Sequence, residues 1–319
     1  MNKATRRLLT TTLVGSAGFL LGSYLTFQGS TMNYKKASRK QRDIDFDGTD
    51  PWALEKKWYQ TQPREPRQIT TADGLTLQAI MLRQPQATTK VAVLAHGYHH
   101  SWEQMAPYAK LFFDLGFNVL VPDARGHGDS DGHTIGFGWL DRKDYVQWAQ
   151  LMTQEFGSSA TLVLFGISMG AATVMAASGE ANLPTTVKAV IEDSGFSSVV
   201  KEVGYRAKTR YNIPHFFIPM TALFAKQQAG YSYYQGDILK QLLHSKTPTL
   251  FIHGGADSYV PPQAFHTLYN AATMPKMAYF VPQADHIEAY LVNRARYEQV
   301  LRQFLTKLGL IEAPASDEA

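Results

Sequence analysis

LVLFGISMGAA, residues 162–172, joins a short apolar run to the pattern Gly-x-Ser-x-Gly and then to small, helix-competent residues. The run shows no apolar/polar alternation, which is typical of a strand buried on both faces. A serine at a tight strand-to-helix turn leaves no room for side chains two positions away, where this chain has Gly166 and Gly170. Gly-x-Ser-x-Gly alone is common in unrelated loops. The strand before it and the helix after it therefore carry the prediction of a nucleophile elbow, with Ser168 at its tip.

Further short apolar runs lie on both sides of the elbow, separated by segments with helical patterns. The runs are residues 91–95, 117–121, 187–192, 249–252 and 277–281. Such alternation predicts an α/β fold with a mostly parallel central sheet covered by helices on both faces. Before these runs, the alternation over residues 67–81 predicts an antiparallel hairpin with its turn at Asp73-Gly74.

Two features refine the helical segments. Ser101-Trp102-Glu103-Gln104 has the pattern of a capping box and predicts the start of a helix. Residues 196–245 are too many for a simple crossover between strands and are rich in Tyr, Phe, Met and Lys. We therefore expect an inserted helical cap at about 196–245.

The N-terminus has the pattern of a membrane-targeting segment. Lys3, Arg6 and Arg7 precede an uncharged span over 8–34, whose apolar core of about 20 residues is near the length needed to cross a bilayer. No clear Ala-x-Ala cleavage site follows, so residues 1–34 are interpreted as an uncleaved anchor. A signal peptide that is removed, and a buried core helix, are the alternatives. On the anchor interpretation, removal of 1–34 should release a soluble, active enzyme.

The charges on the two sides of this anchor predict opposite orientations in the membrane. The positive-inside rule applied to the N-terminal cations places Met1 in the cytoplasm and the rest of the chain outside the cell. A second group of cations just beyond the span argues the other way: Lys35, Lys36, Arg39, Lys40 and Arg42. Residues 35–66 are interpreted as a tether with one short docking helix around Trp52 to Tyr59, and residues 67–319 as the catalytic domain.

Composition excludes several function classes. The net charge of the 319 residues is only +4, with much of the excess near the N-terminus, so nucleic-acid binding has little support. The absence of cysteine excludes disulfides, a thiol nucleophile and thiolate metal sites. His99-His100 lacks further ligands at metal-binding spacing, so no metal is expected.

Taken together, residues 69–308 resemble the α/β-hydrolase family. The resemblance rests on the hairpin, the strand end His96-Gly97, the loop Asp-x-Arg-Gly-His-Gly at 123–128, the elbow, a late Asp and a later His. In that family the triad occurs in the order Ser, Asp, His, which implies Ser168, Asp257 and His286. It also implies an oxyanion hole formed by the backbone N–H groups of Tyr98 and Met169.

Alternatives to these roles remain open. Asp193 ends a predicted strand and could replace Asp257 as the acid, whereas Asp285 would have to fold back on its neighbour His286. Arg125 and Asp129 are interpreted as structural residues of their loop. Three tyrosines of the cap could line an acyl or aromatic pocket or belong to its core: Tyr231, Tyr233 and Tyr234.

The resemblance implies a serine hydrolase that cleaves small carboxylic esters through an acyl-enzyme without a cofactor, similar to poorly characterised cell-surface hydrolases of Gram-positive bacteria. We expect it in the cell membrane, with the catalytic domain outside, or alternatively secreted after signal cleavage. A serine peptidase of the same fold is the alternative activity. A non-catalytic binding module is disfavoured because Ser168, Asp257 and His286 are all present.

Overall fold

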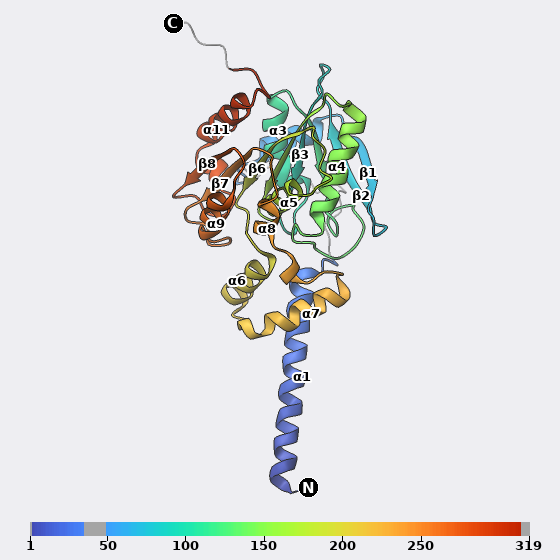
Figure 1. Cartoon of the computed structure of the whole chain (residues 1–319), viewed down its shortest axis with the longest axis vertical. Helices are drawn as coiled ribbons and strands as arrows, with labels where there is room; N and C mark the ends of the chain where they lie inside the picture. The colour runs from blue at the N-terminus through green and yellow to red at the C-terminus, as the bar shows by residue number, and fades with distance from the viewer. Residues whose placement is uncertain (1, 35–48, 314–319) are drawn as a thin grey trace. The chain divides into compact units, whose positions relative to one another are not determined.

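The computed structural model describes residues 2–34 and 49–313 (Figure 1). The cations expected at 35–42 and the first part of the tether lie outside the described residues. The chain divides into two compact units. The sheet unit contains residues 33–34, 49–197 and 237–313, and the insertion unit contains residues 2–32 and 198–236. This division differs from the one drawn on the sequence, since the N-terminal helix groups with most of the predicted insertion.

The sheet unit is built on eight strands in the order β1-β2-β4-β3-β5-β6-β7-β8. β1 pairs antiparallel with β2, β2 pairs antiparallel with β4, and all other pairs are parallel. The strands are β1 Glu65–Thr70, β2 Thr76–Leu82, β3 Lys90–Ala95, β4 Asn118–Pro122, β5 Thr161–Ile167, β6 Val187–Asp193, β7 Thr249–Gly254 and β8 Lys276–Val281. The predicted hairpin and the mostly parallel sheet are confirmed.

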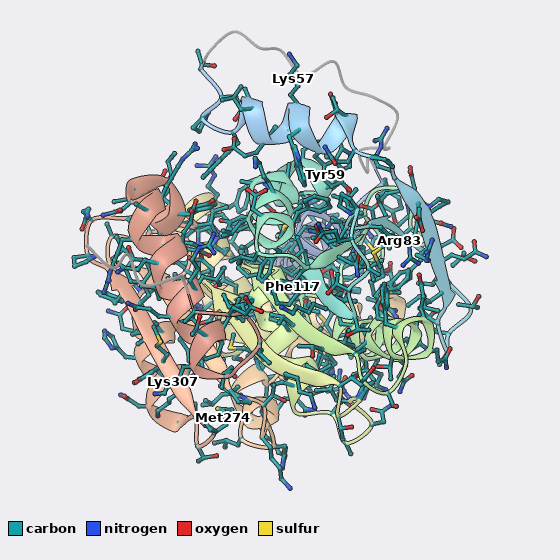
Figure 2. The ribbon with its side chains drawn as sticks, turned by 90° about the horizontal axis from the view of Figure 1, so that it is seen from above. Lys57, Tyr59, Arg83, Phe117, Met274 and Lys307 are labelled. Carbon is teal, nitrogen blue, oxygen red and sulfur yellow. The ribbon has the colours of Figure 1, made fainter. Side chains whose placement is uncertain are left out.

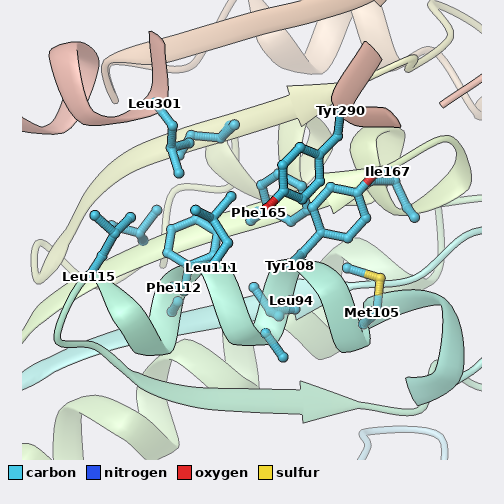
Figure 3. Packing of buried hydrophobic residues seen from close by; sticks show 14 of the residues in the cluster. Leu94, Met105, Tyr108, Leu111, Phe112, Leu115, Phe165, Ile167, Tyr290 and Leu301 are labelled. Atoms are coloured by element: carbon cyan, nitrogen blue, oxygen red, sulfur yellow. The ribbon is translucent and has the colours of Figure 1, made fainter. Parts of the chain in front are cut away.

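Helices cover both faces of this sheet (Figure 1). They are α2 Ala53–Thr61, α3 Trp102–Asp114, α4 Asp141–Phe156, α5 Met169–Ser178, α8 Ile238–Leu242, α9 Gln263–Ala271, α10 Ala289–Val292 and α11 Arg294–Lys307. On one face, α3, α11 and β5 share a cluster of buried side chains that includes Tyr108, Phe112, Phe165 and Leu301, which Figure 3 labels. On the other face, α4 and α5 cover the sheet with Trp148, Val174 and their neighbours.

The docking helix expected before the hairpin is α2, which lies on α3. Its Tyr59 is 1% exposed and stacks on Trp102, with ring centroids 4.8 Å apart. Figure 2 shows Tyr59 pointing into the sheet unit and Lys57 pointing away from it. Burial of one aromatic ring of this kind is worth roughly 1.5–3 kcal/mol, so α2 is an integral part of the sheet unit.

The insertion unit contains α1 Lys3–Thr31, α6 Val199–Tyr211, η1 His215–Phe217, α7 Ile218–Gln228 and η2 Tyr233–Gln235. The last turns of α1 form part of its core: Ser23, Phe27 and Thr31 are buried on one side of the helix. Phe19 stacks on Phe217, and the hydroxyl groups of Thr31 and Tyr233 are hydrogen-bonded. The described side chains of the earlier turns of α1 are exposed.

Candidate active site

Ser168 lies at the junction of β5 and α5 with φ 54° and ψ −116°. This backbone conformation is unusual for a residue with a side chain and is typical of a functional turn. The two flanking glycines make it possible. A Cβ at Gly166 would lie 2.2 Å from the carbonyl oxygen of Gly170, and a Cβ at Gly170 would lie 2.0 Å from that of Ala95. The start of α5 therefore lies so close to β5 and β3 that a side chain at either position would clash with the backbone.

Two loops at the carboxyl ends of parallel strands carry the neighbours of this serine: one brings the imidazole of His286, and the other brings the carboxylate of Asp257. The Nε2 atom of His286 is 2.9 Å from Ser168 Oγ, and its Nδ1 atom is 2.7 Å from Asp257 Oδ2. Because Asp257 accepts the Nδ1 proton, Nε2 is left as an acceptor for the serine hydroxyl proton. The structure thus brings together the three side chains that the sequence analysis singled out.

Asp257 is held firmly by its own loop. Its side chain is fully buried, and its Oδ1 atom accepts hydrogen bonds from the backbone N–H groups of Tyr259 and Val260 at 2.8 and 2.7 Å. Its Oδ2 atom is also 3.4 Å from Nε2 of His253, which donates to the carbonyl oxygen of Val260. These contacts fix the carboxylate so that Oδ2 points to His286.

Asp285 serves the loop of His286 rather than its ring. Its Oδ1 atom accepts from the backbone N–H groups of His286 and Ser258, at 2.8 and 3.0 Å. These hydrogen bonds lower the pKa of the Asp285 carboxyl from its ordinary value. The ring of His286 lies parallel to that of Tyr259, with centroids 4.7 Å apart. Asp285 therefore fixes the backbone at His286, while Tyr259 of the neighbouring loop packs against the imidazole ring.

Asp193, the second candidate acid, is fully buried behind the histidine loop. Its carboxyl accepts from Tyr297 Oη at 3.0 Å and from Ser194 Oγ at 2.9 Å. Ser194 Oγ in turn accepts from the backbone N–H of Ile287, the residue after His286. Burial raises the pKa of Asp193 to about 6. Asp193 is thus linked through Ser194 to the loop that carries the imidazole, while the Nδ1 hydrogen bond goes to Asp257.

The segment expected to supply one oxyanion donor follows β3 at His96-Gly97-Tyr98. The N–H of Gly97 donates to Oε1 of Gln104 at 2.7 Å, which fixes the loop immediately before Tyr98. This contact corrects the predicted capping box, because the Gln104 side chain turns to Gly97 and Ser101 makes no side-chain cap bond. The second expected donor, Met169, is the first residue of α5, so its N–H belongs to the turn that has no intrahelical acceptor.

The other conspicuous polar residues have structural contacts. His96 is fully buried, and its Nε2 atom accepts from the N–H of Ala124 at 3.0 Å. Arg125 is bidentate to Asp144 and also pairs with Asp73, which ties the 123–130 loop to α4 and to the hairpin turn. Among the described residues, no group of three or more His, Asp or Glu side chains is placed to hold a metal ion.

Comparison with known proteins identifies the fold. Residues 86–211 match the family model described as serine aminopeptidase, S33, a range that includes Ser168 and ends before Asp257 and His286. The Pyrococcus furiosus esterase Pf2001 superposes with a TM-score of 0.67 at 18% identity, covering 87% of this chain and 98% of that one. The chain has the α/β-hydrolase fold. The α/β-hydrolase GrgF of Penicillium superposes with a TM-score of 0.60, again at 18% identity, over 77% of this chain and 98% of that one.

Sequence relatives extend over most of this α/β-hydrolase. The uncharacterized protein YqkD of Bacillus subtilis is 28% identical over 70% of this chain and 74% of its own length. The uncharacterized membrane protein YNL320W of Saccharomyces cerevisiae is 25% identical over 78% of this chain and 82% of its own. The family model and the esterase neighbours together support a hydrolase function.

Proposed function

We propose that this α/β-hydrolase cleaves carboxylic esters through an acyl-enzyme formed on Ser168. The observation that carries the proposal is the continuous set of hydrogen bonds from Asp257 through His286 to Ser168 Oγ, at 2.7 and 2.9 Å. A serine hydroxyl is a weak nucleophile at neutral pH, and a base within hydrogen-bond distance is the usual means of activating it. The strained backbone at Ser168 presents that hydroxyl at the tip of the elbow.

In the acylation half, Ser168 Oγ attacks the ester carbonyl carbon while His286 Nε2 takes the hydroxyl proton. The carbonyl π electrons move onto oxygen, giving a tetrahedral oxyanion. The backbone N–H groups of Tyr98 and Met169 are proposed to donate to this oxyanion. When the intermediate collapses, the C–O bond to the alcohol breaks, and the imidazolium returns the proton to the departing alkoxide.

In the deacylation half, water replaces the alcohol and the same groups act again. His286 takes a proton from the water, whose oxygen attacks the acyl carbon, and then returns the proton to Ser168 Oγ as the carboxylic acid leaves. Asp257 stays ionised throughout and stabilises the imidazolium that forms twice in each cycle. Side chains and backbone of this chain, with water, complete the cycle, so the proposal involves no cofactor.

A peptidase is the second candidate, because the matched family model is described as a serine aminopeptidase. Two unlike substrates distinguish the two activities: full-length protein in detergent is given an alkanoyl ester, which has no amino group, and in parallel a peptide with a free N-terminus. We expect hydrolysis of the ester and no cleavage of the peptide, with the ester activity lost in Ser168→Ala. Cleavage of the peptide without turnover of the ester would overturn the esterase assignment. A panel of acyl chain lengths and aromatic esters would then define the substrate.

We also propose that α1 anchors the enzyme in the cell membrane, with the sheet unit outside the cell. The helix is long and apolar enough to cross a bilayer, and a relative from yeast is called a membrane protein. Packing of Phe27 and Thr31 inside the insertion unit supports retention of the helix over secretion after cleavage. The test is the N-terminal sequence of the mature protein in membrane fractions. Recovery of a soluble form lacking α1 would overturn the anchor.

A further inference from the structure

The two halves of α1 have different surroundings. From Phe19 onward, one side of the helix is buried in the insertion unit, where Gly22 faces Phe217 and Tyr24 meets Phe224. Before Phe19 the described side chains are exposed, including the large apolar Leu13 and Val14. Only the exposed half is available to cross a membrane.

The exposed half of α1 is too short to leave a linker between the bilayer and the rest of the insertion unit. The uncharged part of that half, Leu8 to Leu21, measures roughly 21 Å at 1.5 Å per residue, which is shorter than the hydrocarbon thickness of a bilayer, about 30 Å. Along α1, the first contacts with the rest of the insertion unit are made at η1, where Phe216 and Phe217 stack on Phe19. If the helix spans the membrane, the surface of the insertion unit around η1 must therefore meet the bilayer interface.

That surface has the composition of a membrane-contacting face. Tyr211 at the end of α6 is 70% exposed, Phe216 in η1 is 62% exposed, and Leu223 on α7 is also exposed. Aromatic side chains of this kind are enriched where protein meets the lipid headgroups. Large apolar side chains exposed to water would otherwise be a liability for aggregation.

The exposed charged side chains of residues 198–236 in the same unit are all cationic. Within residues 198–236, all of which the structure describes, the cationic side chains are Lys201, Arg206, Lys208, Arg210 and Lys226. The one acidic residue of this segment, Glu202, is buried. Lys208 and Arg210 lie in the last turn of α6, next to Tyr211. Cations beside exposed aromatic rings favour a surface of anionic lipid headgroups.

We infer that the face formed by the end of α6, η1 and the exposed side of α7 lies in the headgroup region of an anionic phospholipid bilayer. This inference rests on the proposed anchoring by α1. It goes further in assigning a second, peripheral membrane contact to the insertion helices. Phe216 and Tyr211 would enter the interface, while Lys208 and Arg210 would contact lipid phosphates.

The chain contains no cysteine, so single cysteines can be labelled with an environment-sensitive fluorophore without removing native residues. Full-length variants Tyr211→Cys and Phe216→Cys are reconstituted into vesicles of phosphatidylcholine with phosphatidylglycerol, with 5-doxyl lipid as quencher. Leu13→Cys reports insertion of the helix, and Lys307→Cys reports background quenching on the sheet unit. Tyr211 is the second site because Phe216 also packs on Phe19 and its loss could disturb the fold.

We expect labels at 211 and 216 to be quenched at least about twofold more than the label at 307, and more strongly with phosphatidylglycerol than without it. Replacement of both Lys208 and Arg210 by Gln should reduce that quenching toward the level at 307. Quenching at 13 with only background quenching at 211 and 216 would overturn the inference while leaving the anchor in place. Background quenching at all four sites would overturn both.

Discussion

His286 Nε2 lies 2.9 Å from Ser168 Oγ, although 118 residues separate the two in the chain. The contact depends on the parallel sheet. Ser168 follows β5 and His286 follows β8, and the carboxyl ends of parallel strands lie along one edge. Asp257, which follows β7, reaches the same edge and completes the hydrogen-bonded set.

The identity of the acid is tested by two matched amide substitutions. Asp257→Asn should lower kcat by roughly 10⁴-fold, because an amide that donates to Nδ1 favours the wrong imidazole tautomer. Asp193→Asn should lower kcat less than about tenfold, since its contacts are with Ser194 and Tyr297. Steady-state kinetics on variants shown to fold by thermal melting decide the matter. A crippling effect of Asp193→Asn with a nearly silent Asp257→Asn would move the acid to β6.

Burial of Asp193 has a consequence for stability. Its pKa is raised to about 6 in the folded protein from an ordinary value of 3.8. A carboxyl with a raised folded pKa destabilises the fold as pH rises through the interval between these two values. Between pH 4 and pH 7 the Asp193→Asn variant should therefore gain stability relative to the wild type, by on the order of 3 kcal/mol. Thermal melts of both proteins across this range check the sign, and a constant difference in Tm would contradict it.

Gln104 is predicted to be a positioning residue for the loop before Tyr98. Gln104→Met removes the acceptor for the Gly97 N–H and should lower kcat by about tenfold with little change in KM, because the proposed oxyanion contact forms fully only in the transition state. Gln104→Glu keeps an Oε1 acceptor and is expected to retain most of the activity. An equal loss in both variants, or a loss confined to KM, would show that the contact does not serve the oxyanion.

Two truncations separate the exposed and buried halves of α1. Removal of residues 1–18 should give a soluble protein with a Tm close to that of the full chain. Removal of residues 1–34 also deletes the fully buried Phe27, which alone is worth about 3–5 kcal/mol. We therefore expect lower stability or aggregation of the shorter form, in contrast to the simple release of an active domain that the sequence suggests. Equal melting of the two forms would show that the last turns are dispensable.

Most of the fold could be predicted because each strand of the parallel sheet has a short apolar run as its sequence. The bounds of each run lie within a few residues of those of the strand. The candidate site could be located because Ser168, Asp257 and His286 stand at the ends of such runs. The division of α1 could not be predicted, since apolar residues that face lipid and apolar residues that pack on protein look alike. Phe19 stacks on Phe217, for example, whereas its neighbour Leu20 is exposed.

Two side-chain hydrogen bonds also could not be predicted from the sequence. Gln104 follows Ser101 at capping-box spacing, yet its side chain bonds to Gly97 seven residues earlier. Asp193 is satisfied by Tyr297, 104 residues away, and no local pattern indicates a hydrogen bond over that separation. Both contacts arise from tertiary packing rather than from spacing along the chain.

The central claim, that Ser168 is a nucleophile activated by His286, is tested most directly by covalent labelling with a fluorophosphonate followed by mass spectrometry of the labelled peptide. The wild type should carry one phosphonyl group on Ser168. His286→Ala and Ser168→Ala should remain folded and lose the label, with kcat for ester hydrolysis reduced on the order of 10³-fold or more. Wild-type labelling of the Ser168→Ala protein, or a phosphonyl group mapped to another residue, would contradict the account.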